Sequence, residues 1–294
     1  MNAKTRARAC IILAAALWGV IGVFFNLLSG LGFTQMQVVA IRSATAAAAL
    51  GLYLLVRDRP LFRVRLRDCW CFVGTGVFSL VFFNWCYFTA MELTSLAVAA
   101  VLLYTAPMMV LVMSIVLFHE KFTVRKGVVV LMTFIGCVLV TGLSGGESIG
   151  TVGILFGLAS GFGYALYSIF STYALKKYHS ITITFYTFVL ATIGTLPLSD
   201  LPDLLPRLQK PEVLLYGMGL AILACLFPYL LYTRGLTGVA ASHASVMATV
   251  EPVVATILGV AVFGDVMTAE KMAGIVLILS GIVILNVRLK AAEA

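Results

Sequence analysis

Two stretches of this 294-residue chain align without a gap at an offset of 145 residues: YTAPMMVLVMSIVLFHEKFTVRKG (104–127) and TVEPVVATILGVAVFGDVMTAEKM (249–272). The matched residues are of several kinds and keep one spacing: Pro107 with Pro252, Phe118 with Phe263, Glu120 with Asp265, Thr123 with Thr268, and Lys126 with Lys271. Upstream, Tyr87 and Tyr232 match at the same offset. The alignment indicates an internal duplication that relates the two halves of the chain, 1–146 and 147–294.

The composition is that of a membrane protein. Hydrophobic residues make up 62% of the chain and charged residues 11%, and the mean hydropathy is +1.08. A soluble protein would have about a quarter of its residues charged, and a membrane-spanning helix needs about 20 apolar residues. Ten apolar stretches follow one another, and no connection between them is long enough for a soluble domain: 10–30, 35–56, 69–91, 95–118, 127–144, 150–174, 181–199, 213–233, 239–263 and 272–287. We therefore predict an all-α polytopic membrane protein with ten transmembrane helices, in contact with membrane lipids.

The placement of the basic residues predicts the topology. If the N-terminus is cytoplasmic, sixteen of the 20 Lys and Arg residues fall on cytoplasmic segments, including Arg288 and Lys290 near the C-terminus. Three lie on the other side, and Arg42 lies within the second span. This bias follows the positive-inside rule. We expect both termini in the cytoplasm, a plasma (inner) membrane location, and no nucleic-acid partner for the net charge of +8.

Each half contains five predicted spans. Because five is an odd number, the second half enters the membrane from the opposite side, which makes the duplication a 5+5 inverted repeat. Many secondary transporters are built in this way, with the substrate site near the middle of the membrane between the repeats. A channel or a membrane-embedded enzyme could use the same duplicated scaffold.

Four segments show a family resemblance: LWG (17–19), IRSATAA (41–47), LLYTAPMMVLVMSIVLFHEKFT (102–123) and VEPVVATILGVAVFGDVMTAEKMAGIVLILSGIVI (250–284). Over nearly its whole length the chain resembles the EamA-type members of the drug/metabolite transporter superfamily. The resemblance implies a 5+5 inverted repeat of helices that moves small metabolites, often outward and including amino acids. It does not name the substrate.

Aromatic and single polar residues are the candidates for a binding site. Asn84 and Tyr87 share one helix face in the third span, and Tyr229 and Tyr232 hold the same two positions in the eighth. Such matching faces could meet between the halves and line one cavity. The predicted substrate-binding residues are Trp18, Asn84, Tyr87, Tyr104, Tyr164, Tyr167, Tyr229 and Tyr232. The alternative is that these rings pack the helices together or form interfacial belts.

The ionisable residues within the spans are Arg42, His243 and Glu251. A charged residue there needs a reason, so Glu251 and His243 are candidates for proton coupling or cation recognition. Pro252 leaves a carbonyl about one turn back without its usual partner, and a protonated Glu251 could satisfy that carbonyl. Pro107 and Pro252 are predicted helix-bending points. Arg42 could hold a substrate carboxylate, but a structural role is favoured.

We therefore expect an alternating-access, secondary-active transporter with a small-molecule substrate. The resemblance favours an exporter of amino acids or related amines, with proton coupling as an open option. An importer of sugars, nucleosides or quaternary amines is the alternative. We do not expect an enzyme, because no nucleophile with a base converges on one site. The cysteines have no His or Asp cluster beside them, so we expect no metal and no cofactor.

Overall fold

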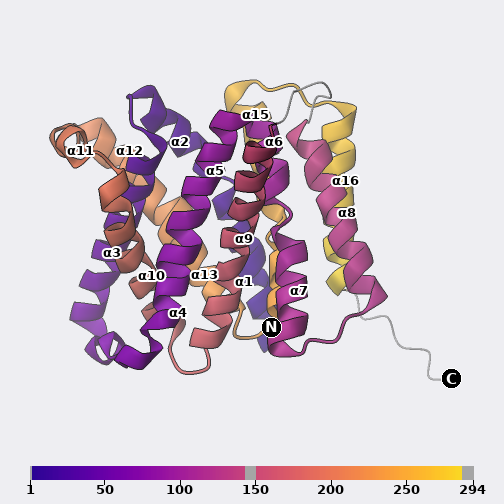
Figure 1. Ribbon diagram of the computed structural model, residues 1–294, viewed down its shortest axis with the longest axis horizontal. Coiled ribbons are helices and arrows are strands. Elements are labelled where there is room, and N and C mark those ends of the chain that lie inside the picture. Colours follow the sequence, from indigo (N-terminus) through magenta and orange to yellow (C-terminus); the bar gives the residue numbers. More distant parts are fainter. Residues whose placement is uncertain (1, 143–149, 287–294) are drawn as a thin grey trace.

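The computed structural model describes residues 2–142 and 150–286 (Figure 1). Within these residues, ten helical segments are long and apolar enough to cross a membrane. In chain order they are α1 and α2 (Ala3–Trp18, Ile21–Gly30), α3 (Gln35–Arg57), α4, the π-helical η3 and α5 (Cys69–Val73, Gly74–Val81, Phe82–Leu93), α6 and α7 (Leu96–Leu103, Ala106–Phe118), α8 (Val124–Thr141), α9 (Thr151–Ala174), α10 (Ser180–Thr195), α12, the π-helical η5 and α13 (Pro211–Ala221, Ile222–Leu226, Phe227–Gly235), α14 and α15 (Ala241–Met247, Val250–Phe263), and α16 (Ala269–Asn286). A short helix, α11 (Leu201–Arg207), lies between α10 and α12.

The ten predicted spans are confirmed, and most of their ends differ by only a few residues. The largest difference is in the first span, which was predicted from residue 10 and begins at Ala3. The helix therefore includes Lys4, Arg6 and Arg8, whose long side chains can reach the polar edge of a membrane. Two basic residues used in the topology prediction, Arg288 and Lys290, lie outside the described residues.

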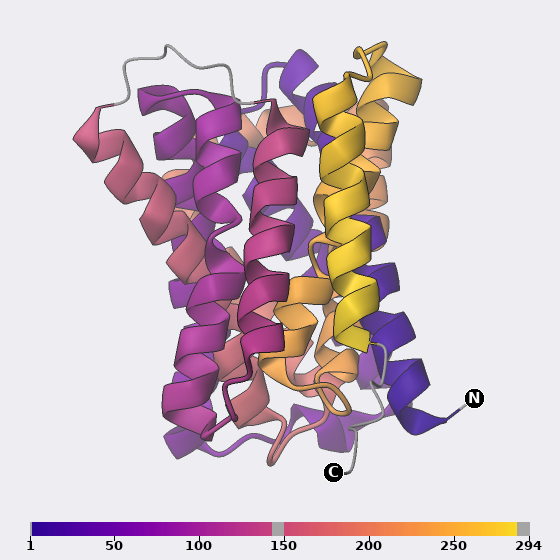
Figure 2. The ribbon, with the colours of Figure 1, turned by 90° about the vertical axis from the view of Figure 1, so that its right-hand side faces the viewer.

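The spans run between two faces of the molecule (Figures 1 and 2). We call the end that carries the N-terminus the N face; the connections after α3, α7, α9 and α13 lie there. The other end, the opposite face, carries the connections after α2, α5, α10 and α15. With five spans in each half, corresponding helices of the two halves run in opposite directions, as the inverted repeat predicts.

Positions 145 residues apart adopt the same local structure. The helices α8 and α16 begin at corresponding residues, Val124 and Ala269. The helix before each of them ends in a left-handed residue, His119 with φ 54° and Gly264 with φ 73°. The π-helical segments also correspond, since η3 ends at Val81 and η5 ends at Leu226. The duplication seen in the sequence is therefore also a duplication of backbone structure.

The two halves pack mainly against each other. α1 lies on α13, α9 on α5, α3 on α10, and α8 on α16; Figure 2 shows α8 and α16 side by side. At the α8–α16 contact, a β-carbon added to Gly136 would lie 2.8 Å from the carbonyl oxygen of Gly274. Small residues let helix backbones approach this closely. Because helices of one half pack on helices of the other, the centre of the molecule is enclosed by both halves.

Candidate functional site

The fourth and ninth spans are each interrupted near their middle. α6 gives way to α7, and α14 to α15, after a gap of two residues. Pro107 and Pro252 follow these breaks in the first turns of α7 and α15, where a proline cannot donate the backbone hydrogen bond that would continue the preceding helix. At each break a backbone N–H donates a hydrogen bond to the carbonyl three residues back instead of four. These bonds are 3.2 Å long for the Thr105 N–H and 3.1 Å for the Thr249 N–H. Broken helices of this kind often surround the substrate site of a transporter.

A cavity of about 320 Å³ lies beside these breaks, and its walls come from both halves. It includes Tyr164 and Glu251 in the middle of their spans. It also includes Asn26 and Met91 near the ends of α2 and α5, so it extends toward the opposite face. Its volume is at the lower end of the roughly 300–1,000 Å³ range of small-molecule sites. The space suits a small metabolite.

Most of the predicted binding residues meet at this cavity. Six of the eight line it: Trp18, Asn84, Tyr87, Tyr104, Tyr164 and Tyr229. The other two, Tyr167 and Tyr232, line a small recess on the side of the N face that shares Trp18 with the cavity. The third and eighth spans thus contribute side chains to one cavity from matching positions. That these residues contact a substrate stays a prediction.

Aromatic rings close the cavity on the side of the N face. The ring centroid of Trp18 is 5.2 Å from those of Tyr229 and Tyr232, and that of Tyr167 is 4.9 Å from that of Tyr229. The hydroxyls of Tyr167 and Tyr232 form hydrogen bonds of 2.6 and 2.8 Å with hydroxyl side chains of α13 and α9. The rings are therefore held by polar bonds as well as by packing, and they separate the cavity from the N face.

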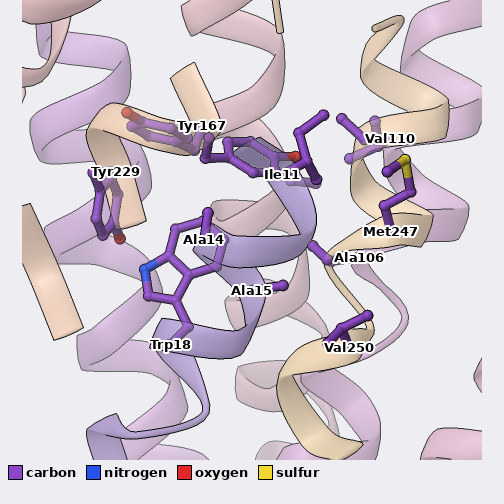
Figure 3. Packing of buried hydrophobic residues seen from close by; sticks show 14 of the residues in the cluster. Ile11, Ala14, Ala15, Trp18, Ala106, Val110, Tyr167, Tyr229, Met247 and Val250 are labelled. Atoms are coloured by element: carbon purple, nitrogen blue, oxygen red, sulfur yellow. The ribbon is translucent and has the colours of Figure 1, made fainter. Parts of the chain in front are cut away.

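One face of α1 is a stripe of apolar residues at helical spacing, which ends at Trp18: Ile11, Ala14, Ala15 and Trp18. All four are buried. Figure 3 shows this stripe beside Tyr167 and Tyr229, and opposite residues next to the two helix breaks: Ala106, Val110, Met247 and Val250. The small alanines of α1 allow the broken ninth span, α14 and α15, to pack close to it.

Glu251 lies in the first turn of α15 and is half-buried. The hydroxyl of Tyr164 donates a hydrogen bond of 3.2 Å to its Oε2. The carbonyl group that Pro252 was expected to leave free belongs to Ala248, and it accepts the backbone N–H of Glu251 at 3.0 Å. In the described structure the backbone therefore serves this carbonyl, and the Glu251 side chain lines the cavity.

Arg42 of α3 also lines the cavity, although only 6% of it is exposed. Its Nη2 donates to Oδ1 of Asn84 at 2.9 Å, and the Asn84 amide nitrogen donates to the carbonyl of Leu80 in η3 at 2.6 Å. Arg42 Nε has no hydrogen-bond partner in the described part of the chain. The sequence analysis favoured a structural role for Arg42 and left it out of the binding residues. Its depth in an apolar span was the signal that pointed to it.

A polar cluster joins the two halves on the N face. In this Glu120 bridge (Glu120, Lys126 and Ser242), the Glu120 carboxylate accepts hydrogen bonds from Ser242 in α14 and from Lys126 Nζ, the latter at 3.0 Å. Burial alone would raise the pKa of Glu120, but these hydrogen bonds and the nearby charges of Lys126 and His243 together hold the pKa below its ordinary value. His243 lies within electrostatic range of the bridge and does not line the cavity with Glu251.

A separate depression of about 760 Å³ lies on the N face, between the bridge and the N-terminal end of α1. It is lined by Lys4, Glu120 and Ala241, among others, and it shares no lining residue with the central cavity. The aromatic rings around Trp18 and the Glu120 bridge lie between the central cavity and this depression. The described structure is therefore closed between its centre and the N face.

Proteins similar to this chain are transporters. An uncharacterized transporter of Archaeoglobus fulgidus is 29% identical over 276 residues, which cover 94% of each chain. The uncharacterized transporter YwfM of Bacillus subtilis is 24% identical over 296 residues, which cover 97% of this chain and 96% of the relative. A protein of known crystal structure with 19% identity shares the fold, with a TM-score of 0.78 and 96% of each chain covered.

The two halves also match one family description. The model of the EamA-like transporter family matches residues 6–142 and again residues 151–287. These two matches cover most of the chain and correspond to the two structural repeats. The chain belongs to the EamA-like transporter family and is a multi-pass membrane transporter.

Proposed function

We propose that this transporter is an alternating-access exporter of amino acids or related amines. The observation that carries the proposal is the central cavity, which is lined by aromatic rings, Asn84 and Glu251, extends toward one face and is closed to the other. Tyrosine and tryptophan rings offer apolar surface together with a hydrogen bond, and their faces attract cations. A carboxylate beside such rings favours a small, partly apolar molecule that carries an ammonium group.

Glu251 is the proposed coupling residue. An unpaired charge in the membrane interior costs several kcal/mol, and in the described structure this side chain accepts a hydrogen bond from a neutral hydroxyl, that of Tyr164. Either a proton or a substrate ammonium would neutralise the carboxylate. If the two compete for it, each substrate molecule that leaves is exchanged for a proton. An acidic exterior would then drive the substrate outward.

The direction of export depends on the orientation of the chain. We propose that the N face is cytoplasmic and the membrane is the plasma (inner) membrane, because Lys and Arg residues concentrate on the segments at that face. The cavity as described then extends toward the outside. In the other state, movement of the two halves would separate the aromatic rings that lie between Trp18 and the N face, and it would close the opposite face.

The test uses liposomes that contain the purified protein and are loaded with a mixture of amino acids, amines, nucleosides and sugars. Mass spectrometry follows which solutes leave, with and without a pH gradient. Protein-free liposomes measure leakage, and Glu251→Gln measures transport without the coupling carboxylate. The proposal predicts selective loss of amino acids or amines, faster with the gradient in the parent protein than in Glu251→Gln. Selective loss of sugars or nucleosides, or equal gradient dependence in both proteins, would overturn it.

A further inference from the structure

The central cavity contains a positive group as well as the negative one. Arg42 on α3 and Glu251 on α15 both line it. We propose that these two side chains form a dipolar site in which Arg42 binds the carboxylate, and Glu251 the ammonium, of a free α-amino acid. This inference rests on the proposed function and narrows its substrate class from amines in general to zwitterions.

The first support is the state of Arg42. A guanidinium is charged at every physiological pH and offers five N–H donors. Arg42 is 94% buried, since 6% is exposed, yet its hydrogen-bond partner in the described structure is the neutral amide of Asn84. Its Nε has no partner there. A buried charge in this state is incompletely compensated, and a carboxylate is the group that fits a guanidinium best, with two parallel hydrogen bonds.

The second support is the way in which Arg42 is held. The π-helical segment η3 presents the carbonyl of Leu80 to the amide nitrogen of Asn84. This bond turns the amide oxygen of Asn84 toward Arg42, which it reaches at 2.9 Å. Asn84 is therefore a positioning residue that fixes the guanidinium at the cavity wall. π-Helical segments of this kind are often found at functional sites.

The third support is the relation between the two charges. Arg42 lies close enough to Glu251 to act on it electrostatically. The two are not within the 4.0 Å of a direct ion pair, and the ion pairs of the described residues lie elsewhere. Each charge is thus held by one neutral partner, Asn84 or Tyr164. A molecule with a carboxylate and an ammonium on one carbon atom would supply the partner that each charge lacks.

Much of the cavity wall toward the opposite face is apolar. Phe25, Phe88, Met91 and Leu96 lie there, with Asn26 as a polar neighbour. A substrate held between Arg42 and Glu251 could place its side chain against these residues. We therefore expect amino acids with apolar side chains that fit a space of about 320 Å³.

The experiment compares molecules that share one side chain and differ in charge. Liposomes with the parent protein are loaded with leucine, with 3-methylbutylamine, which lacks the carboxylate, and with 4-methylpentanoate, which lacks the ammonium. A second set uses phenylalanine, 2-phenylethylamine and 3-phenylpropanoate. Initial efflux is corrected for leakage from protein-free liposomes. The parent protein should carry at least one amino acid no less than tenfold faster than its matched amine and acid.

Variants assign the carboxylate site to Arg42. Arg42→Gln keeps a hydrogen-bonding side chain and removes the charge, so the ratio of amino-acid to amine transport should fall tenfold or more, about 1.4 kcal/mol, while amine transport does not fall. Arg42→Lys keeps the charge but loses the planar fork, so its ratio should be intermediate. Arg59→Gln is the matched control, because Arg59 is exposed on the N face.

The outcomes separate the two proposals. If amine and amino acid leave the parent liposomes equally fast, the dipolar site is wrong and the proposed function stands. If neither leaves while an unrelated solute does, both are wrong. An Arg42→Gln protein that keeps the parental ratio overturns the role of Arg42. If thermal unfolding shows that this variant is not folded, the comparison in the parent protein and the Arg42→Lys ratio decide the question.

Discussion

Replacing Ser242 by alanine should open the N face. Ser242 is 2% exposed, and its hydroxyl donates to the carboxylate of Glu120 in the other half of the chain. Lys126, the other partner of Glu120, belongs to the same half as Glu120, so it does not hold the halves together. The inverted repeat does not provide an equivalent bond on the opposite face, because the residue 145 positions before Ser242 is Ala97, which has no side-chain donor. The bond therefore favours the state in which the N face is closed.

The expected size of the effect follows from the burial of the bridge. A hydrogen bond to a charged group contributes roughly 1.5–3 kcal/mol to stability. The side chain of Glu120 is 14% exposed, so water competes for the carboxylate and the lower value, about 1.5 kcal/mol, applies. Since 1.4 kcal/mol corresponds to a factor of ten, Ser242→Ala should raise the ratio of open to closed N faces about tenfold.

Electron–electron distance measurements can count the two states. Nitroxide labels at Lys121→Cys and Thr237→Cys mark exposed residues of the two halves on the N face, with the partly exposed native Cys10 and Cys69 replaced by serine. Ser242→Ala should increase the long-distance population. Ser245→Ala is the matched control, since Ser245 is equally buried on the same helix but bonds only a carbonyl of that helix. An unchanged distribution in Ser242→Ala, or an equal change in both variants, would refute the reasoning.

Three further predictions follow from the same structure. The hydrogen bonds to Glu120 hold its pKa below the ordinary value. The closed state is therefore stabilised at pH values above the ordinary glutamate pKa, and it loses this stabilisation as the pH falls through the lowered pKa. The same label pair should show more open N faces on acidification, and an opposite trend would contradict this. Gly161→Val should lower the thermal unfolding temperature, because a β-carbon at Gly161 would lie 2.8 Å from Thr105 Oγ1 and overpacking costs about 1–3 kcal/mol. The control Gly30→Ala, with nothing within 4 Å of the added atom, should leave the temperature unchanged. Glu251→Gln should retain less than a tenth of the stimulation of efflux by a pH gradient, because the amide cannot exchange a proton; full stimulation in the variant would remove Glu251 from coupling.

The duplicated pattern predicted much of the fold. Pro107 and Pro252 marked the two broken spans, and the pairing of Asn84 and Tyr87 with matching positions in the eighth span placed both sets near one cavity. An inverted repeat brings equivalent positions together around its axis, which is why sequence spacing could point to one central region. The prediction that the lining residues bind a substrate is still to be tested by transport.

The contacts between helices could not be predicted in the same way. His243 and Glu251 are eight residues apart and were both candidates for coupling, but the break between α14 and α15 separates them, and His243 lies near the Glu120 bridge. The partner of Arg42 is also set by tertiary structure, because Asn84 is turned toward it by a π-helical segment. Spacing along a chain shows which residues share a helix face, but it does not show which neighbour that face meets.

Blocking the cavity with a covalent label is the most direct test of the central claim that substrate passes through it. Ala255 lines the cavity and is exposed there, so Ala255→Cys should react with a membrane-impermeant methanethiosulfonate applied from the opposite face. Ala273→Cys, at an exposed position on α16 away from the cavity, is the control. We predict that labelled Ala255→Cys loses transport, that substrate slows its labelling, and that labelled Ala273→Cys stays active. Full transport by labelled Ala255→Cys would contradict the claim.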